Sequence, residues 1–255
     1  MLGWLLSFWY WRNRDLDAVL GGEGLTPGET PIFADSGAFS ASTSGVAIDR
    51  NEYAAWLRRW GHWFTTYANL DTIGDPEATW VNQQWFEDRG LSPLPVVHGG
   101  TDWAWLEHYA ERYRYIGLGG LARKDIPATQ YMPWVIECFR RAGPDVRFHG
   151  FGVTDWRALS ALPWESVDST TWKAGHRFGA LVVFSRGKLK QIRKHLIPQH
   201  RAALAAIGYT VADAQRAVNG DWRTAQDIAI ASFAAASRAL SRRHGRPMTI
   251  YLGKE

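Results

Sequence analysis

The chain of 255 residues contains a single cysteine, Cys138, and only three methionines. One thiol cannot form a disulfide framework within the chain, and it cannot build a cysteine-rich zinc site. Cys138 lies in an apolar run with helical character, so we interpret it as a buried structural thiol that suits a reducing cytoplasm. Disulfide-bonded secreted folds and cysteine-based zinc fingers are thereby excluded.

The sequence also lacks a long apolar run and a recognisable leader. Residues 1–11 are apolar but carry no basic front and no small-residue cleavage site, and they are too few to cross a bilayer. We therefore predict a buried first strand and no membrane partner. Hydrophobic residues make up 46% of the chain and charged residues 21%, which favours a folded core over disorder.

Short β-prone runs alternate with segments of helical periodicity. The predicted strands are Leu5–Tyr10, Ile32–Ala34, Trp63–Asn69, Leu94–His98, Tyr115–Leu118, Val146–Gly150, Ser166–Val167 and Ala180–Phe184. Predicted helices between them cover 51–60, 75–89, 103–114, 127–142 and 155–162. Eight strands alternating with helices predict an α/β fold, a TIM-like (β/α)8 barrel, in residues 1–188.

After Lys188 the pattern changes to helical segments, predicted at 189–207, 211–220 and 221–243. We predict that residues 189–255 form a C-terminal helical extension packed on the barrel, without a zinc subdomain. The final run, Met248–Leu252, fits either a short extra strand or an ordered end.

Three acidic residues stand at or just beyond predicted strands: Asp35, Asp71 and Asp168. In a barrel the C-terminal strand ends converge on one active site, so these carboxylates are candidates for shared chemistry. Each also fits a structural role, because Asp35 and Asp168 could cap helices and Asp71 could belong to a polar turn.

Glycine follows three other predicted strands, at 99–100, 117–120 and 150–152. Without a Cβ, the backbone at these positions can approach a flat ligand closely. Tight turns between a strand and a helix also use glycine. Three such runs beside three acids favour a pocket for a planar ring.

Five segments resemble, in order and rough spacing, those of tRNA-guanine transglycosylases over residues 32–172. Asp-Ser-Gly-Ala-Phe at 35–39 resembles the Asp-Ser-Gly-Gly-Phe signature of that family. The segments at 96–100, 116–121 and 150–153 resemble its Val-Gln-Gly, Gly-Gly-Leu and Gly-Val-Gly segments. Val-Asp-Ser-Thr at 167–170 resembles the Phe-Asp-Cys segment that holds the family's nucleophile.

The chain cannot build the zinc site of three cysteines and a histidine that the tRNA enzymes carry. In this it looks more like the DpdA-type, often phage-encoded relatives that exchange guanine for a 7-deazaguanine in DNA. The resemblance implies a cytoplasmic enzyme, in the host cytoplasm if phage-encoded, with DNA and a free 7-deazaguanine base as partners and no cofactor. Base exchange in tRNA, a non-catalytic nucleic-acid-binding barrel and a plain sugar hydrolase remain open.

The resemblance also assigns roles. Asp168 matches the nucleophile that would attack the anomeric carbon, and Asp35 matches the acid that would protonate the departing guanine. Where the tRNA enzymes have a base-reading glutamine, this chain has His98. The residues expected to bind the base are Ser36, Phe39, Asp71, His98, Gly99, Gly119 and Gly120. The spacing of His62, His108, His149 and His176 predicts no metal site, so we interpret these histidines as structural, although His149 could lie near the site.

The net charge is +4 and the pI about 9.3, and basic residues gather in 177–201 and 238–246. A solvated helix face fits either stretch alone. Beside an acidic centre, the two together favour a nucleic-acid partner. Backbone phosphates are expected to meet Lys173, Arg177, Arg186, Lys188 and Lys190. The helices of 189–245 could complete the barrel wall, clamp DNA or form a homodimer surface.

Overall fold

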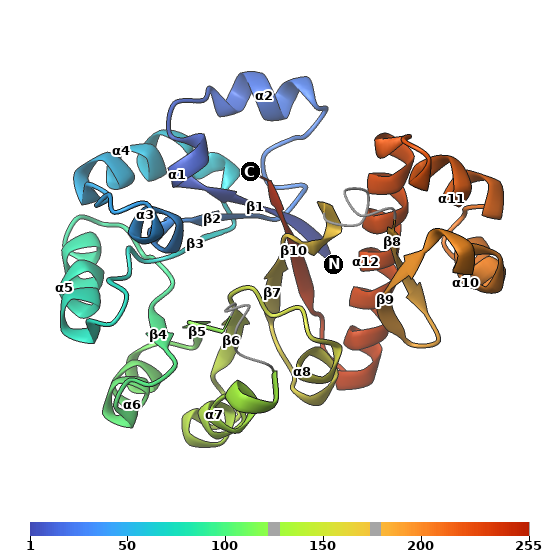
Figure 1. The fold of residues 1–255 in the computed structure, drawn as a ribbon. Helices are drawn as coiled ribbons and strands as arrows, with labels where there is room; N and C mark the ends of the chain where they lie inside the picture. The colour runs from blue at the N-terminus through green and yellow to red at the C-terminus, as the bar shows by residue number, and fades with distance from the viewer. Residues whose placement is uncertain (122–127, 174–179, 255) are drawn as a thin grey trace.

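A computed structural model describes residues 1–121, 128–173 and 180–254 (Figure 1). Its strands are β1 (Leu2–Ser7), β2 (Ile32–Asp35), β3 (Thr66–Tyr67), β4 (Val96–His98), β5 (Tyr115–Gly119), β6 (Arg147–Gly150), β7 (Ser166–Ser169), β8 (Ala180–Ser185), β9 (Lys188–Arg193) and β10 (Thr249–Lys254). Its α-helices are α1 (Phe8–Trp11), α2 (Leu16–Gly22), α3 (Ala38–Thr43), α4 (Arg50–Trp60), α5 (Pro76–Glu87), α6 (Trp103–Arg112), α7 (Ala128–Ala142), α8 (Trp156–Ala161), α10 (Arg201–Ala205), α11 (Val211–Val218) and α12 (Trp222–His244). Short 3-10 helices are η1 (Gly61–Trp63), η2 (Thr171–Lys173) and η3 (Lys194–His200).

Eight strands form one parallel, curled sheet in the order β3-β2-β1-β10-β7-β6-β5-β4. The two end strands approach each other, because Ala68 and Leu94 form an isolated parallel bridge. Around it, the Asn69 N–H donates to the Leu94 carbonyl (2.9 Å) and the Leu94 N–H to the Tyr67 carbonyl (2.7 Å). The predicted α/β class is confirmed, and the curled sheet with its helices is compatible with a TIM-like (β/α)8 fold.

Several helices begin where the sequence places a capping side chain. The Asp155 carboxylate accepts the backbone N–H groups of Arg157 and Ala158 at the start of α8. At the start of α5, Asp75 is the capping residue and Pro76 occupies the first turn, where its missing N–H is not needed. The first turns of α5 and α8 are thus fixed by side chains close to them in the chain.

The hydrophobic core lies in layers on the two sides of the sheet. Inside the curl, a small cluster from several strands packs together: Leu5, Phe33, Ala68, Leu94 and Tyr251, with Tyr115 and Phe151 against it. Outside the curl, larger clusters join the sheet to the surrounding helices. Helix α12 contributes to two clusters, since Phe233 and Ala236 pack toward the sheet while Ile228 packs toward β8 and α11.

The prediction for the eighth strand was wrong. Residues 180–185 form a strand, β8, but it pairs antiparallel with β9 in a separate two-stranded sheet. Arg186 and Gly187 connect the two strands with φ angles of 51° and 76°, the positive values that a two-residue hairpin turn requires. The eighth strand of the main sheet is instead β10, which lies between β1 and β7.

Other predicted boundaries also move. The segment 189–207 was expected to be one helix, but it begins with strand β9 and continues with η3 and α10. Leu189 and Ile192 pair with residues of β8 instead of forming the apolar face of a helix. The first strand covers residues 2–7 instead of 5–10, and α1 follows it. Residue 188 lies inside the β8–β9 hairpin, and residues 249–254 belong to the main sheet; the division into two domains stays a prediction.

Candidate functional site

The three predicted acids lie at or just beyond the carboxyl ends of β2, β3 and β7. Asp35 is the last residue of β2, Asp168 lies in β7, and Asp71 follows β3 after a short loop. Because all eight strands are parallel, their carboxyl ends meet on the same side. The charges of Asp71 and Asp168 both act on Asp35, so the structure brings the three carboxyls into one electrostatic cluster.

Asp35 is the acid whose ionisation the fold changes most clearly. Burial, followed by the negative charges of Asp71 and Asp168, raises the pKa of Asp35 to about 7. The Gly37 N–H, which donates to Oδ2 of Asp35 at 3.0 Å, works in the opposite direction. Glycine is required at 37, since φ is 78° and a Cβ would lie 2.6 Å from the Ser7 hydroxyl. This carboxyl can therefore both hold and release a proton near neutral pH.

Asp71 is bound by two neighbours. Its Oδ2 lies 2.8 Å from Nε2 of His98, and its Oδ1 accepts a hydrogen bond from the Ser36 hydroxyl at 3.4 Å. The imidazole of His98 passes over Gly119, where a Cβ would come within 2.6 Å of the ring. Thus Ser36, Asp71, His98 and Gly119, all predicted for base binding, lie together, and Gly119 leaves the space that the His98 ring needs.

Asp168 is held from the β6 side. The Gly152 N–H donates to Oδ1 of Asp168 at 2.7 Å. Nε2 of His149, in β6, lies 3.4 Å from the same oxygen. The arrangement fixes one carboxylate oxygen and leaves Oδ2 without a hydrogen bond from any residue that the structure describes.

The remaining residues predicted for the base pocket line the strands and the rim. The Gly99 N–H donates to the Gly119 carbonyl at 3.2 Å, and Gly120 has a φ of 75°, so these glycines shape the ends of β4 and β5. Phe39, on α3, is 62% exposed and packs into no core cluster among the described residues. Its ring is therefore available at the surface, and stacking on a base stays a prediction.

Two residues that interact with the acids, Tyr53 and His149, were not predicted as part of the site. The buried Tyr53 hydroxyl donates to the Ala68 carbonyl at 2.8 Å, and burial together with Asp35 and Asp71 raises the pKa of this phenol. His149 contacts Asp168 directly, whereas the sequence placed it only nearby. The sequence feature that could have indicated this contact is the position of His149 directly before Gly150, on strand β6, whose neighbour β7 carries Asp168.

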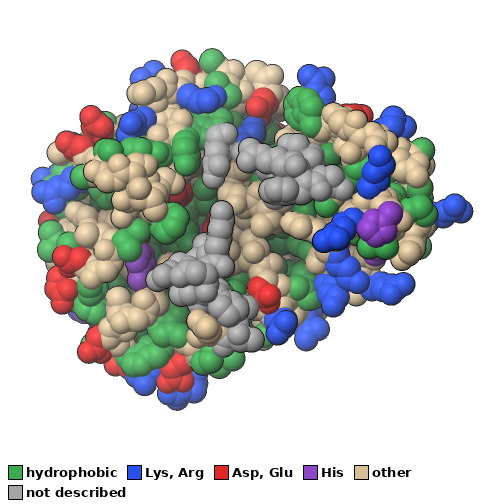
Figure 2. Space-filling view, in the orientation of Figure 1, with side chains coloured by type: hydrophobic (Ala, Val, Ile, Leu, Met, Phe, Trp, Pro, Cys, Tyr) green, Lys and Arg blue, Asp and Glu red, His purple; other side chains and the backbone are tan. Residues whose placement is uncertain are grey.

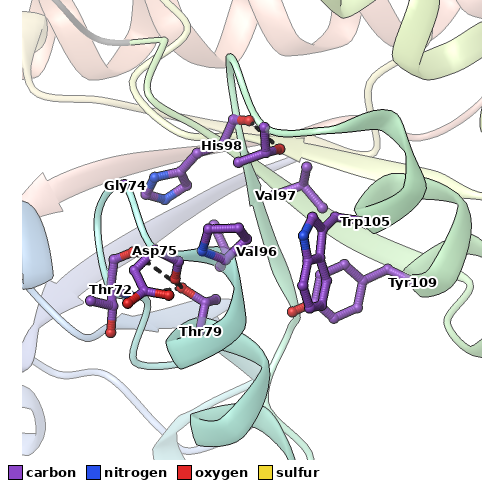
Figure 3. A pocket seen from close by; sticks show the side chains of 11 residues that line it. Thr72, Gly74, Asp75, Thr79, Val96, Val97, His98, Trp105 and Tyr109 are labelled. Atoms are coloured by element: carbon purple, nitrogen blue, oxygen red, sulfur yellow. Dashed lines mark hydrogen bonds between the residues drawn. The ribbon is translucent and has the colours of Figure 1, made fainter.

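A narrow cavity lies next to the His98 ring (Figure 3). His98 and the loop before α5 form one wall, and Trp105 and Tyr109 of α6 form the other, across Val96. Its lining residues are Thr72, Gly74, Asp75, Pro76, Thr79, Val96, Val97, His98, Thr101, Trp105 and Tyr109. Neither Asp35 nor Asp168 lines it, so this cavity is a side pocket that shares only the His98 ring with the acid cluster.

The predicted phosphate-binding residues fall mainly on the β8–β9 hairpin. Arg186 and Lys188 are exposed and Lys190 is half-buried. Figure 2 shows blue Lys and Arg side chains gathered at the right of the view, where Figure 1 places the hairpin. For Lys173 only the backbone, in η2, is described, and Arg177 lies outside the described residues.

Comparison with protein-family models found no family that matches this chain, and no curated protein matches it. Within 1–121, 128–173 and 180–254, no group of three or more His, Cys, Asp or Glu side chains is arranged to hold a metal ion. No helix in the described part of the chain has the length and apolar character needed to cross a membrane. The site's own geometry therefore carries the functional argument.

Proposed function

We propose that this chain is a TIM-like (β/α)8 enzyme that exchanges guanine for a 7-deazaguanine base in DNA through a covalent aspartyl-glycosyl intermediate. The observation that carries the proposal is the placement of two carboxyls, Asp35 and Asp168, in one electrostatic cluster at the carboxyl ends of the strands. Asp35 has a pKa raised to about 7, and Asp168 presents an oxygen that accepts no hydrogen bond from the described residues. An acid and a nucleophile are the two groups that such an exchange requires.

In the first half-reaction, Oδ2 of Asp168 forms a bond to the anomeric carbon of the target nucleotide. The bond from that carbon to N9 of guanine breaks, its electron pair stays with the base, and the proton of Asp35 neutralises the departing guanine. In the second half, the incoming 7-deazaguanine gives its N9 proton to Asp35 and attacks the same carbon, which releases the Asp168 carboxylate. Atoms and charges balance over the cycle, and Asp35 returns to its protonated state.

Base recognition is assigned to Asp71, with His98 and Ser36 beside it. The carboxylate can accept hydrogen bonds from the ring N–H and amino group of guanine, which a base without those donors cannot supply. His98 holds Oδ2 of Asp71 at 2.8 Å, and this contact fixes the direction in which the remaining lone pairs point. Gly99 and Gly120 add no side chain at the ends of β4 and β5, Gly119 makes room for the His98 ring, and Phe39 supplies an exposed aromatic surface.

The polymer is assigned to DNA, with tRNA as the alternative. The glycosidic bond of a duplex nucleotide is hidden in the base stack, so the target nucleotide has to be extruded into the site. The exposed cations of the β8–β9 hairpin, Arg186 and Lys188, support a role in holding the phosphate backbone. A free 7-deazaguanine base is the second substrate.

The test is a direct exchange assay. The protein is incubated with guanine-containing DNA and a panel of 7-deazaguanines, and the digested nucleosides are weighed by mass spectrometry. The proposal expects a modified deoxynucleoside with wild type and none with Asp168→Asn, which keeps its DNA affinity because it retains the shape of the side chain.

Parallel incubation with tRNA separates the two polymers, since incorporation only into tRNA would move the proposal to that substrate. Guanine released without any incoming base would identify a hydrolase. A folded wild type that binds DNA yet neither exchanges nor releases a base would leave a non-catalytic nucleic-acid-binding protein as the remaining reading.

A further inference from the structure

His149 is an ionisable side chain enclosed inside the curl of the sheet. Its exposure is 0%. The ring stacks on Phe33 at 4.5 Å between centroids and meets the Phe151 ring edge-on at 4.5 Å. Apolar surroundings make each ring nitrogen costly to leave without a partner. The hydrogen bonds of the two nitrogens therefore indicate what this side chain does.

A short chain of hydroxyls determines which nitrogen carries the proton. Oγ of Ser166 lies 2.6 Å from Nδ1 of His149 and 2.6 Å from the Tyr115 hydroxyl. The Tyr115 hydroxyl has no other acceptor among the described residues, so its proton is satisfied by donation to Ser166. The Ser166 proton is then free to go to Nδ1, which becomes the acceptor. A neutral imidazole that accepts at Nδ1 carries its proton at Nε2.

One acceptor, Oδ1 of Asp168, lies near Nε2 of His149. Nε2 lies 3.4 Å from this oxygen and makes no hydrogen bond with any residue that the structure describes. That separation is longer than a normal hydrogen bond, and contacts of this kind shorten when a substrate closes the site. The Gly152 N–H already donates to the same oxygen at 2.7 Å. The Gly152 N–H thus fixes Oδ1, Nε2 of His149 lies beside the same oxygen, and none of the described donors hydrogen-bonds to Oδ2.

We propose that His149 is a positioning residue for the nucleophile: its Nε2–H, with the Gly152 N–H, holds Oδ1 of Asp168 so that Oδ2 faces the sugar. Tyr115 and Ser166 fix the tautomer from behind. This inference rests on the proposed function and adds the orientation of its nucleophile. His149 itself does not touch the substrate.

The first test does not depend on activity. Long-range ¹⁵N–¹H NMR spectra give the tautomer of each histidine, and the spectrum of His149→Gln assigns the His149 signals by their loss. The expected result is an Nε2–H tautomer in wild type and a weakened preference in Ser166→Ala, which removes the donor to Nδ1. An Nδ1–H tautomer in wild type would overturn the inference, whatever the exchange assay shows.

The second test separates positioning from folding by kinetics. His149→Leu is expected to lower kcat for base exchange by about 10- to 100-fold, the equivalent of one hydrogen bond to a charged group, with KM for DNA unchanged. His149→Gln places an amide N–H near the Nε2 position and is expected to recover part of the loss. The matched control is His108→Leu, because His108 also has a buried Nε2 without a partner among the described residues but lies on α6 outside the acid cluster.

The outcomes distinguish the two proposals. Wild-type kcat in a folded His149→Leu variant, or an equal loss in His108→Leu, would overturn the positioning role while leaving the exchange reaction standing. Absence of exchange in wild type would overturn the proposed function instead. In that case the NMR tautomer still decides whether His149 directs its proton at Asp168.

Discussion

Because the pKa of Asp35 is raised, the free energy of unfolding of wild type is expected to fall as the pH rises. Asp35→Asn removes this pH dependence. The pKa rises from 3.8 to about 7, chiefly by burial and then by the charges of Asp71 and Asp168. About three pKa units correspond to ~4 kcal/mol. Unfolding releases the Asp35 proton wherever the pH lies between these two values. Stability from this group is therefore fully present below about pH 4 and is lost as the pH rises through about 7.

The assay is urea unfolding of wild type and Asp35→Asn at several values between about pH 4 and pH 8. Asparagine keeps an oxygen for the Gly37 N–H but carries no charge, so the variant lacks this titration. The free energy of unfolding of the variant, relative to wild type, is expected to rise by ~4 kcal/mol over that range. A relative stability that stays flat, or that falls with pH, would refute the assignment of a raised pKa.

The matched control is Asp49→Asn, which makes the same chemical change at an exposed helix cap. Hydrogen bonds from the Asn51 backbone lead the causes that lower the pKa of Asp49. The stability that ionised Asp49 contributes is lost as the pH falls below the usual range of an aspartate. At about pH 6 and above this contribution is fully present. The difference between this variant and wild type is expected to be constant from about pH 6 to pH 8.

Three further substitutions test other parts of the structure. Gly119→Ala puts a Cβ 2.6 Å from the His98 ring, so base exchange is expected to fall with KM for the base raised, as steady-state kinetics would show; an unchanged KM would contradict the packing. Tyr53→Phe leaves the Ala68 carbonyl without its donor and is expected to lower the free energy of unfolding by about 1–3 kcal/mol in urea titrations, whereas a neutral result would deny the buried hydrogen bond. Replacing the hairpin cations by glutamine is expected to weaken DNA binding at all sequences and to flatten its salt dependence in fluorescence titrations, and an unchanged salt slope would remove the hairpin from the interface. The residues replaced are Arg186, Lys188 and Lys190.

The sequence identified the elements that are fixed locally. Tyr115–Leu118 is mostly apolar and is followed by Gly119 and Gly120, and it belongs to a strand of the main sheet, β5. Ala180–Phe184 has the same local character, and it is also a strand, yet it pairs elsewhere. Strand β8 packs against α12 on one face and against α11 on the other, so it is as apolar as a strand inside a sheet. Composition therefore predicted the strand but not its partner.

In the candidate site, too, some features could be predicted from the sequence and others were set by the tertiary structure. Asp35 and Asp168 could be selected because strand ends converge in parallel α/β folds and because their segments resemble those of tRNA-guanine transglycosylases. The pairing of Asp71 with His98 depends on the direction of a ring over Gly119. The contact of His149 with Asp168 depends on the register between β6 and β7. These are distances between segments remote in the chain, and no local pattern encodes them.

By itself, then, the sequence predicted most of the strands and helices and gave the acids at the strand ends as candidates, since each follows from neighbours a few residues apart. Only the tertiary structure decided that residues 249–254 complete the main sheet between β1 and β7. It also decided that Asp35 is buried and lies near two other carboxyls, and both effects raise its pKa. The physical reason is that strand pairing and burial are set by the packing of the whole chain, and a local segment carries no record of what will surround it.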